Sequence, residues 1–113
     1  MAVYVIAQVQ TDDPDGYMEY VEAGRPTLID HGAWYVGRAS AAGDAEVIEG
    51  DDPGRYIIIG FESRDAVWKW YNSSEYQAAK KIREHISKVN LFIVDEIPAG
   101  SGIPTRPLGD VQW

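Results

Sequence analysis

Three separate segments of this 113-residue chain carry apolar side chains at nearly every position, namely residues 3–10, 57–59 and 89–94. A strand presents successive side chains to opposite faces of its sheet, so segments of this kind predict a sheet that is apolar on both faces. Both faces must then be covered by other parts of the structure. No other feature of the sequence constrains the fold as strongly.

The first segment leads into a predicted helix. Residues 3–10 read as a strand that stops at a turn, where Asp13 is suited to cap a helix and Pro14 to occupy its first position. Pro26 is expected to kink or interrupt this helix, because proline lacks the N–H that the helix interior needs. Gly32 is a suitable stop after the last turn.

The remaining sequence predicts more strands than helices. Residues 33–40, 45–49 and 55–61 are predicted to be extended, and residues 89–97 form the last strand. Between the last two of these segments lies a predicted helix that is broken near Ser73. The expected order is therefore strand, helix, strand, one or two strands, broken helix and strand.

This order predicts an α+β protein with a ferredoxin-like split β-α-β sheet and both helices on one face. The other sheet face would leave an apolar patch well above the roughly few hundred Å² that a monomer usually exposes. A second copy stacked face to face would cover it, which predicts a homodimer in the form of a dimeric α/β barrel with two-fold symmetry. We expect this domain to span residues 1–97.

Residues 98–113 differ in composition from the domain, with several glycines and prolines and no periodic pattern. The simplest interpretation is a frayed terminus. However, the segment also carries Ile103, Leu108, Val111 and Trp113, which a solvated tail does not need. We therefore expect an extended tail that lies along the partner subunit.

Composition limits the partners and the chemistry. The chain has 18 acidic and 10 basic residues and a formal charge of -8, which disfavours nucleic acid and anionic membranes as partners. It has no cysteine, which removes disulfides and thiolate chemistry and leads us to expect the cytoplasm. No phosphate-binding glycine loop or metal-ligand cluster occurs, so neither a cofactor nor a metal is expected.

Several short strings together resemble the domain-of-unknown-function family 1330. The most specific string is Trp70-Tyr71-Asn72-Ser73-Ser74-Glu75-Tyr76-Gln77, and the others are Gly16-Tyr17 with Tyr20, Gly32 with Tyr35 and Arg38, Glu49-Gly50-Asp51, Arg55, Phe61-Glu62-Ser63 and Arg83. The resemblance covers about residues 3–96 and implies the dimeric α/β barrel fold. Proteins of that wider superfamily use a cleft between sheet and helices as cofactor-free monooxygenases, lactone isomerases, polyketide cyclases, haem enzymes or binders. The chain departs from the family pattern at Ser74, at Trp34 and in its longer tail.

Four candidate ligand-binding residues lie on the two helices. Tyr71, Ser73 and Tyr76 surround the helix break, where backbone N–H groups at the new helix start could bind a carboxylate or enolate oxygen. Alternatively, Ser73 only caps the helix and Tyr76 packs beneath it. Tyr17 belongs to the core or to the pocket wall, where its hydroxyl would suit an aromatic or enol ligand.

Three further candidates carry charge or can move a proton. Arg38 is expected on the same strand face as Trp34 and Val36, where it either binds an anion or pairs with Glu49. Glu49 is a candidate general base if it is buried, and His31 is a second candidate for that catalytic role. Exposure to solvent at a strand end and at a helix end would explain both residues equally well.

These residues fit three hypotheses. The preferred one is a homodimer that binds a small aromatic or enolisable molecule in a cleft between sheet and helices. The second is a cofactor-independent enzyme of the isomerase, cyclase or monooxygenase type that uses acid-base chemistry. The third is a non-catalytic assembly module, in which the sheet face serves only to join subunits.

Overall fold

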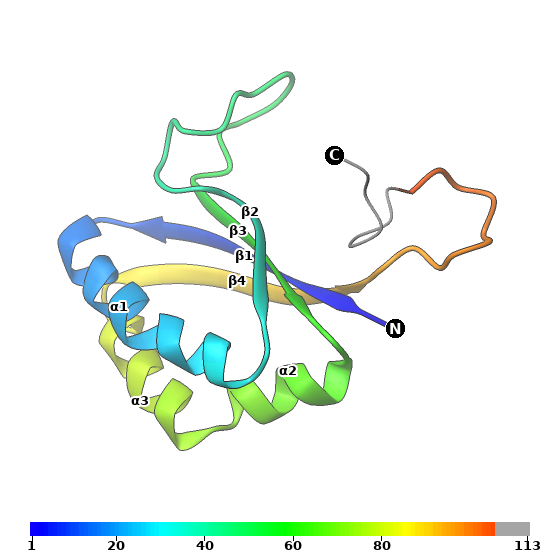
Figure 1. Cartoon of the computed structure of the whole chain (residues 1–113). Coiled ribbons are helices and arrows are strands. Elements are labelled where there is room, and N and C mark those ends of the chain that lie inside the picture. Colours follow the sequence, from blue (N-terminus) through cyan, green and yellow to red (C-terminus); the bar gives the residue numbers. More distant parts are fainter. Residues whose placement is uncertain (106–113) are drawn as a thin grey trace.

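The computed structural model describes residues 1–105, which form one four-stranded antiparallel sheet with three helices (Figure 1). The strand order is β2-β3-β1-β4, so β1 and β3 are central and β2 and β4 form the edges. The helices lie on one side of the sheet (Figure 1). The predicted α+β, ferredoxin-like architecture is confirmed. The elements in chain order are β1 Val3–Thr11, α1 Pro14–Asp30, β2 Trp34–Ala39, β3 Arg55–Phe61, α2 Arg64–Tyr71, α3 Ser74–Arg83 and β4 Ser87–Asp95.

Helix α1 begins where the sequence predicts and ends at Asp30, just before the expected stop at Gly32. The Asp13 side chain accepts a hydrogen bond of 3.0 Å from the Gly16 N–H, and Pro14 is the first helical residue. The prediction that Pro26 interrupts the helix is wrong, because α1 continues to Asp30. Thr27 and Leu28 are buried directly after the proline, and their packing holds the last turn in place.

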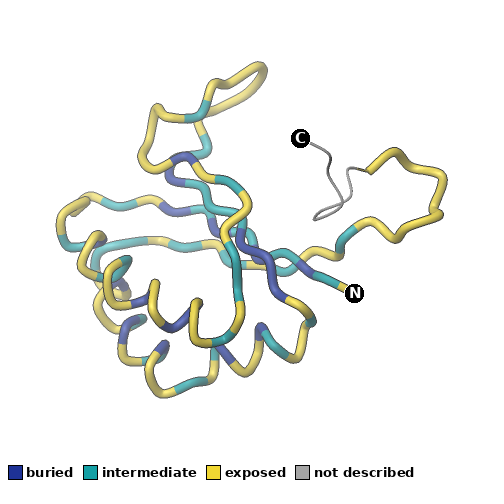
Figure 2. Tube along the Cα trace, viewed as in Figure 1, coloured by how far each residue is buried: buried dark blue, intermediate teal, exposed yellow. Residues whose placement is uncertain are grey.

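The helical side of the sheet forms the core. Alternate residues of β1 point into it, and Val3, Val5 and Val9 are buried together with Phe61 on β3 and Tyr76 on α3. Phe61 is fully buried. The dark-blue stretches of Figure 2 follow these inner faces of sheet and helices. The period-two burial of β1 shows that its register is fixed by the helices on one side.

The opposite side of the sheet, which we call the open face, is not covered by any helix within residues 1–105 (Figure 1). In its middle, Ile6 of β1 lies between Ile58 of β3 and Phe92 of β4. In the next row, Tyr4 lies beside Val94. The two residues of β4 in these rows are exposed, Phe92 by 38% and Val94 by 37%. The open face is therefore apolar and accessible in its middle, whereas toward one end it carries the polar pair Gln8 and Asn90.

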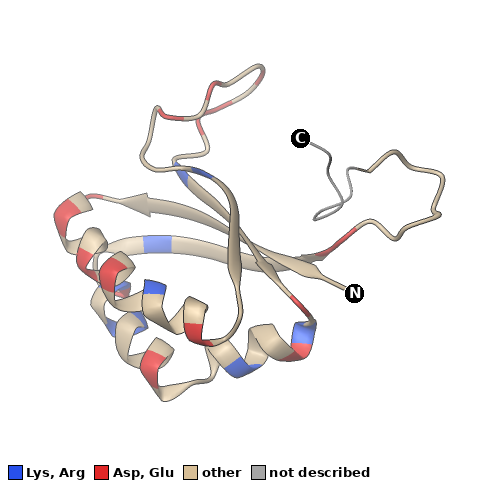
Figure 3. Cartoon of the chain, in the orientation of Figure 1, with Lys and Arg blue, Asp and Glu red and all other residues tan. Residues whose placement is uncertain are grey.

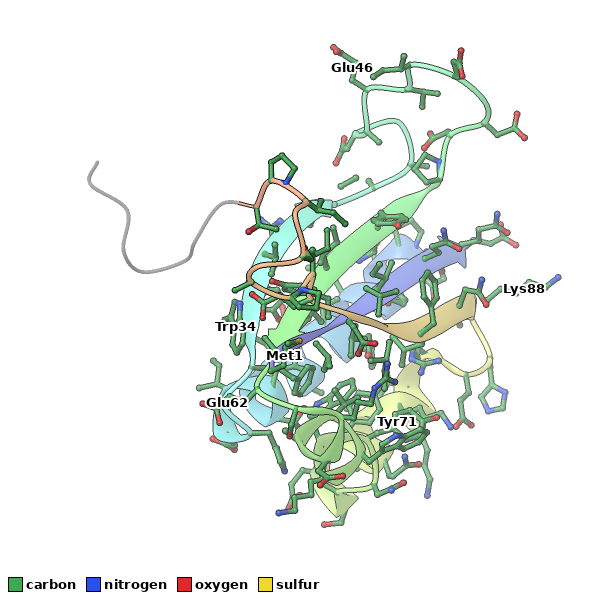
Figure 4. All side chains as sticks on the ribbon, turned by 90° about the vertical axis from the view of Figure 1, so that its right-hand side faces the viewer. Met1, Trp34, Glu46, Glu62, Tyr71 and Lys88 are labelled. Atoms are coloured by element: carbon green, nitrogen blue, oxygen red, sulfur yellow. The ribbon has the colours of Figure 1, made fainter. Side chains whose placement is uncertain are left out.

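Residues 40–54 form a loop that projects from the end of the sheet (Figure 1). The prediction of an extended strand over residues 45–49 is wrong, because this segment has no neighbouring strand to pair with. Asp52 closes the base of the loop by accepting hydrogen bonds from the N–H groups of Gly43 and Gly54. The tip is solvated, with Ile48 95% exposed and Glu46 pointing away from the sheet (Figure 4).

A bulge in β2 changes which residues share a face. Tyr35 pairs with Ile59 and Arg38 pairs with Ile57, with a register shift between Tyr35 and Gly37. The extra residue places Tyr35 and Arg38 on the same side of the sheet, which is the helical side. The prediction that Arg38 shares a face with Trp34 is therefore wrong.

Residues 98–105 contain no helix or strand, and Ile103 is 56% exposed. The predicted contact of the tail with a partner subunit also rests on Leu108, Val111 and Trp113, which lie outside the described residues. In the part of the chain that the structure covers, no helix combines the length and apolar composition required to span a bilayer.

The structure predicts that removing the hydroxyl of Thr27 lowers the stability of the folded chain. This hydroxyl is buried, accepts a hydrogen bond of 3.0 Å from the indole N–H of Trp70 and donates one to the Gly24 carbonyl. Thr27→Val keeps the shape but leaves the buried indole N–H unpaired, which should lower the free energy of unfolding by about 1–3 kcal/mol. Urea unfolding measures this change, and the Trp70 indole resonance in ¹H–¹⁵N spectra should move.

Thr27→Ser is the matched control, since it keeps the hydroxyl and loses one methyl group. It should leave the Trp70 indole resonance near its wild-type position. Equal indole shifts in both variants would show that the hydrogen bond does not hold Trp70.

Candidate ligand-binding site

The candidate site is a small cavity between α1 and the helical side of the sheet, which we call the inner pocket. Tyr17, Tyr20 and Gly24 line it from α1, Arg55 from β3, and Tyr76 from α3. Apolar side chains of the central strands form its floor. The inner pocket thus combines apolar walls with a few polar groups that converge on one point, which is typical of a small-molecule site.

The mouth of the inner pocket is formed by side chains that can move. Arg25, Tyr35 and Arg38 line it and are exposed. The β2 bulge is the reason that Tyr35 and Arg38 both reach this side. The closed cavity measures about 50 Å³, enough for a few water molecules at roughly 10–15 Å³ each. A larger guest requires lining side chains to move.

Arg55 is the most unusual group in the inner pocket. It is the first residue of β3 and is only 9% exposed. Its guanidinium lies over the Tyr17 ring, 5.3 Å from the centroid, and Nη1 donates a hydrogen bond of 2.6 Å to the Ser40 carbonyl. Its Nε–H is buried and has no partner among the described residues. One edge of a buried cation is therefore unsatisfied.

A second buried arginine lies behind the tyrosines. Arg83 of α3 is 8% exposed and donates through Nη2 to the Tyr76 hydroxyl at 3.2 Å. The Tyr76 and Tyr20 hydroxyls share a hydrogen bond of 2.9 Å, and the Arg83 guanidinium lies 5.3 Å from the centroid of the Tyr20 ring. Together these three side chains form a connected polar network inside an aromatic cluster.

Neither buried arginine has a carboxylate partner within residues 1–105. The ion pairs there are Arg64 with Asp95 and Lys80 with Glu84, and both pairs lie on the surface. The sequence-based alternative, an ion pair between Arg38 and Glu49, is therefore wrong, since neither residue belongs to these pairs. Three arginines, Arg25, Arg38 and Arg55, line the inner pocket, although the molecule as a whole is acidic.

Burial and charge act on the tyrosines in opposite directions. Burial raises the pKa of Tyr20 far above its ordinary value, and the nearby Tyr76 adds to this shift. Burial also raises the pKa of Tyr17, while the positive charges of Arg55 and Arg83 lower it in part. Both hydroxyls are therefore protonated at neutral pH and can donate hydrogen bonds to a guest. They are not bases under those conditions.

A second depression, the outer groove, lies between α2 and edge strand β4. It measures about 410 Å³ and is lined by Val67, Trp68, Trp70, Tyr71, Phe92 and Arg64. Trp70 lines both spaces and stacks on Tyr76 with ring centroids 4.2 Å apart, so this aromatic pair separates them. Among the described residues that line the outer groove, the charged one is Arg64, which is already paired with Asp95. The groove therefore offers mainly apolar contact.

The structure brings together some of the sequence-predicted ligand residues and separates others. Tyr17, Tyr76 and Arg38 line the inner pocket. Tyr71, the last residue of α2, belongs to the outer groove and is labelled in Figure 4. Ser73 caps α3, where its hydroxyl accepts from the Tyr76 N–H at 3.2 Å and donates to the Trp70 carbonyl.

The two candidate catalytic residues lie elsewhere. Glu49 is exposed in the 40–54 loop, and His31 follows the end of α1, where its Nδ1 lies 2.8 Å from the Thr27 carbonyl. Neither residue lines the inner pocket. Their proposed roles in proton transfer stay predictions. No cluster of three or more metal-ligating side chains occurs in residues 1–105.

Sequence reasoning missed Arg55 and Arg83 as site residues. A signal existed for Arg83, which shares a helical face with Tyr76 and Ala79 at spacings of seven and four residues. A charged residue on an apolar helix face is a candidate for burial with a function. Arg55 had a weaker signal, since it begins an apolar strand and strand ends are usually solvated.

The architecture is the ferredoxin-like α+β fold on which the dimeric α/β barrel proteins are built. The chain belongs to the family described as domain of unknown function DUF1330, whose model matches residues 2–97. A comparison with curated proteins finds no match.

Solved structures show the same fold at low sequence identity. A protein of unknown function from Rhodopseudomonas palustris has a TM-score of 0.69 and 14% identity, over 86% of this chain and 83% of that one. The cofactor-independent oxygenase SnoaB from Streptomyces nogalater has a TM-score of 0.63 and 8% identity, over 88% and 97%. A dimeric ferredoxin-like protein of unknown function from Thermobifida fusca has a TM-score of 0.54 and 14% identity, over 83% and 92%.

The raised pKa of Tyr20 predicts a loss of stability in alkali. Above its ordinary pKa of 10.0 the unfolded chain releases this proton and the folded chain keeps it. The free energy of unfolding should therefore fall with rising pH, by about 1.4 kcal/mol per pH unit for each such tyrosine. Urea unfolding at pH 9, 10 and 11 measures the slope.

Tyr20→Phe removes this proton and should make the decline between pH 10 and pH 11 shallower. The comparison uses slopes, because the variant also loses its hydrogen bond to Tyr76 at every pH. Identical slopes for wild type and variant would contradict the assignment.

Proposed function

We propose that this protein is a homodimer that binds a small aromatic or enolisable molecule in the inner pocket. The observation that carries the proposal is the convergence of Tyr17, Tyr20, Tyr76 and Arg55 on one cavity in which the described residues place no carboxylate. Tyrosine rings offer flat apolar contact, and their hydroxyls and the arginine offer directional hydrogen bonds. This combination suits a flat, conjugated molecule with one polar end.

The open face supports the dimer. Its central row, Ile58, Ile6 and Phe92, consists of large apolar side chains in contact with water. A second copy presents the same surface, so two sheets can stack about a two-fold axis. A structure with the same fold, from Thermobifida fusca, is described as dimeric. The absence of cysteine fits a cytoplasmic setting for this dimer.

Binding is preferred over turnover because of the groups present in the inner pocket. A general base for proton transfer should titrate near neutral pH. Tyr17 and Tyr20 have raised pKa values, and arginine stays protonated. Glu49 and His31 would have to reach the pocket from outside it. A pure assembly module is less well supported, since assembly through the open face does not need two buried arginines on the other side.

The dimer predicts that a charge in the middle of the open face separates the subunits. Ile58→Asp places a carboxylate at the centre of the proposed interface, where two unpaired charges per dimer would be buried. The dissociation constant should rise at least roughly 100-fold. Sedimentation equilibrium measures it for the wild type and the variant.

Ile29→Asp is the control, because Ile29 is 64% exposed near the end of α1, on the far side of the sheet from the open face. It should leave the dimer intact. A wild-type chain that sediments as a monomer at micromolar concentration would refute the homodimer.

The pocket predicts opposite effects of Gly24→Ala on stability and on binding. The new methyl group would meet the Tyr20 ring at 3.8 Å, which is ordinary contact, so the helix should gain about 0.5–1 kcal/mol. The same methyl group narrows the inner pocket. Native mass spectrometry of the purified wild type should show a dimer with a discrete additional mass, and the variant should retain less of it.

Urea unfolding gives the stability change in the same samples. A variant that is more stable yet keeps full occupancy would place the ligand outside the inner pocket. A wild type without any retained mass, after incubation with extracts of its host cells, would contradict small-molecule binding.

A further inference from the structure

The two buried guanidiniums are the feature that pocket shape and fold leave unexplained. Arg55 and Arg83 are each more than nine-tenths buried, and the Nε–H of each is buried without a partner in residues 1–105. An arginine cannot shed its charge by releasing a proton at physiological pH. Each therefore brings a permanent positive charge into the interior.

Such charges are costly unless something compensates them. Buried ionised groups in proteins are almost always paired or hydrogen-bonded on all sides. Here the compensation is partial, through the Tyr17 ring and the Ser40 carbonyl at Arg55, and through the Tyr20 ring and the Tyr76 hydroxyl at Arg83. No carboxylate completes it within the described residues.

Of the two, Arg55 is the one that a ligand can reach, because it lines the inner pocket. Its Nη1 is already committed to Ser40, and its unpaired Nε–H leaves one edge of the guanidinium free. The guanidinium edge matches a carboxylate or enolate, which accepts hydrogen bonds with full negative charge. The Tyr17 ring lies beside the same cation, with its centroid 5.3 Å from the guanidinium.

We infer that the ligand of the inner pocket is a small organic anion, a carboxylate or an enolate attached to a flat conjugated body, whose charged end binds the free edge of Arg55. The inference rests on the proposed function and adds the charge of the ligand to it. The flat body lies against the tyrosine rings. Arg83 supports the site from behind by holding Tyr76, which in turn holds Tyr20.

Long-range attraction does not explain the recognition. The formal charge of the chain is -8, and the loop next to Ser40 is acidic at its tip (Figure 3). An anion therefore approaches against the net charge of the chain, and the positive charge that attracts it is local, at Arg25 and Arg38 at the mouth and at Arg55 inside the pocket. This favours selection of anions at the pocket over unspecific attraction to the protein surface.

The test compares acids with their neutral amides. The probes are benzoate and benzamide, salicylate and salicylamide, and acetoacetate and acetoacetamide, each titrated into the full-length dimer by isothermal calorimetry. At least one acid should bind at least roughly tenfold more tightly than its amide, because a hydrogen bond to a charged group is worth more than one to a neutral group. The same acid should shift the Arg55 Nε–H resonance in ¹H–¹⁵N spectra.

Three variants locate the charge selection. Arg55→Gln should abolish the preference for the acid, whereas Lys81→Gln, which removes one exposed positive charge on α3, should retain it. Arg55→Lys keeps a charge but has no Nε–H, so the preference should fall without disappearing. It also assigns the Arg55 Nε–H resonance by its loss. If Arg55→Gln does not fold, the wild-type resonance shift and Arg55→Lys decide.

The outcomes separate the two proposals. Amides that bind as tightly as their acids would overturn the anion inference and leave the proposed function in place. Two results together would overturn the assignment to Arg55. They are a preference for the acid in Arg55→Lys that equals the wild-type preference, and an Arg55 Nε–H resonance of the wild type that does not shift when the acid binds. Failure of every acid and amide to bind would overturn the inference and the proposed function together.

Discussion

Strand β1 lies in the centre of the sheet, and its side chains alternate between the helical core and the open face. On one side Val5 packs under Trp70 and Tyr76 in the main core cluster. On the other side Ile6 meets Ile58 and lies in contact with water. A shift of one residue would exchange the two sets of side chains, so burial on the helical side fixes the register of both faces. The core, the pocket floor and the open face all depend on this alternation.

Local signals in the sequence were sufficient for most of the fold. Capping residues, turn residues and apolar periods are read within one turn or one strand, which explains why the start of α1 at Pro14 and the break at Ser73 were predicted. Two predictions failed because they depend on distant partners. Residues 45–49 have strand-like composition but no neighbouring strand, and Pro26 stays helical because Leu28 is held in the core.

The candidate site was less predictable than the fold for a related reason. The face on which Arg38 lies depends on a bulge in β2, and a single extra residue reverses every later position of the strand. The burial of Arg55 depends on its contact with Tyr17 of α1, which no local pattern encodes. Tyr17 and Tyr76 were among the residues predicted from the sequence, and both line the inner pocket. An aromatic residue on an apolar helix face packs inward, whether it fills the core or lines a pocket.

The role inferred for Arg55 also links the pocket to the projecting loop. The same guanidinium that faces the cavity holds the Ser40 carbonyl at 2.6 Å, and Ser40 is the first residue of the loop. A ligand that completes the hydrogen bonds of Arg55 binds only the folded chain, so it stabilises the fold as its concentration exceeds its dissociation constant. It also stiffens the side chain on which the base of the loop rests. A buried cation that weakens the empty protein is therefore tolerable if the protein spends most of its time with an anion bound.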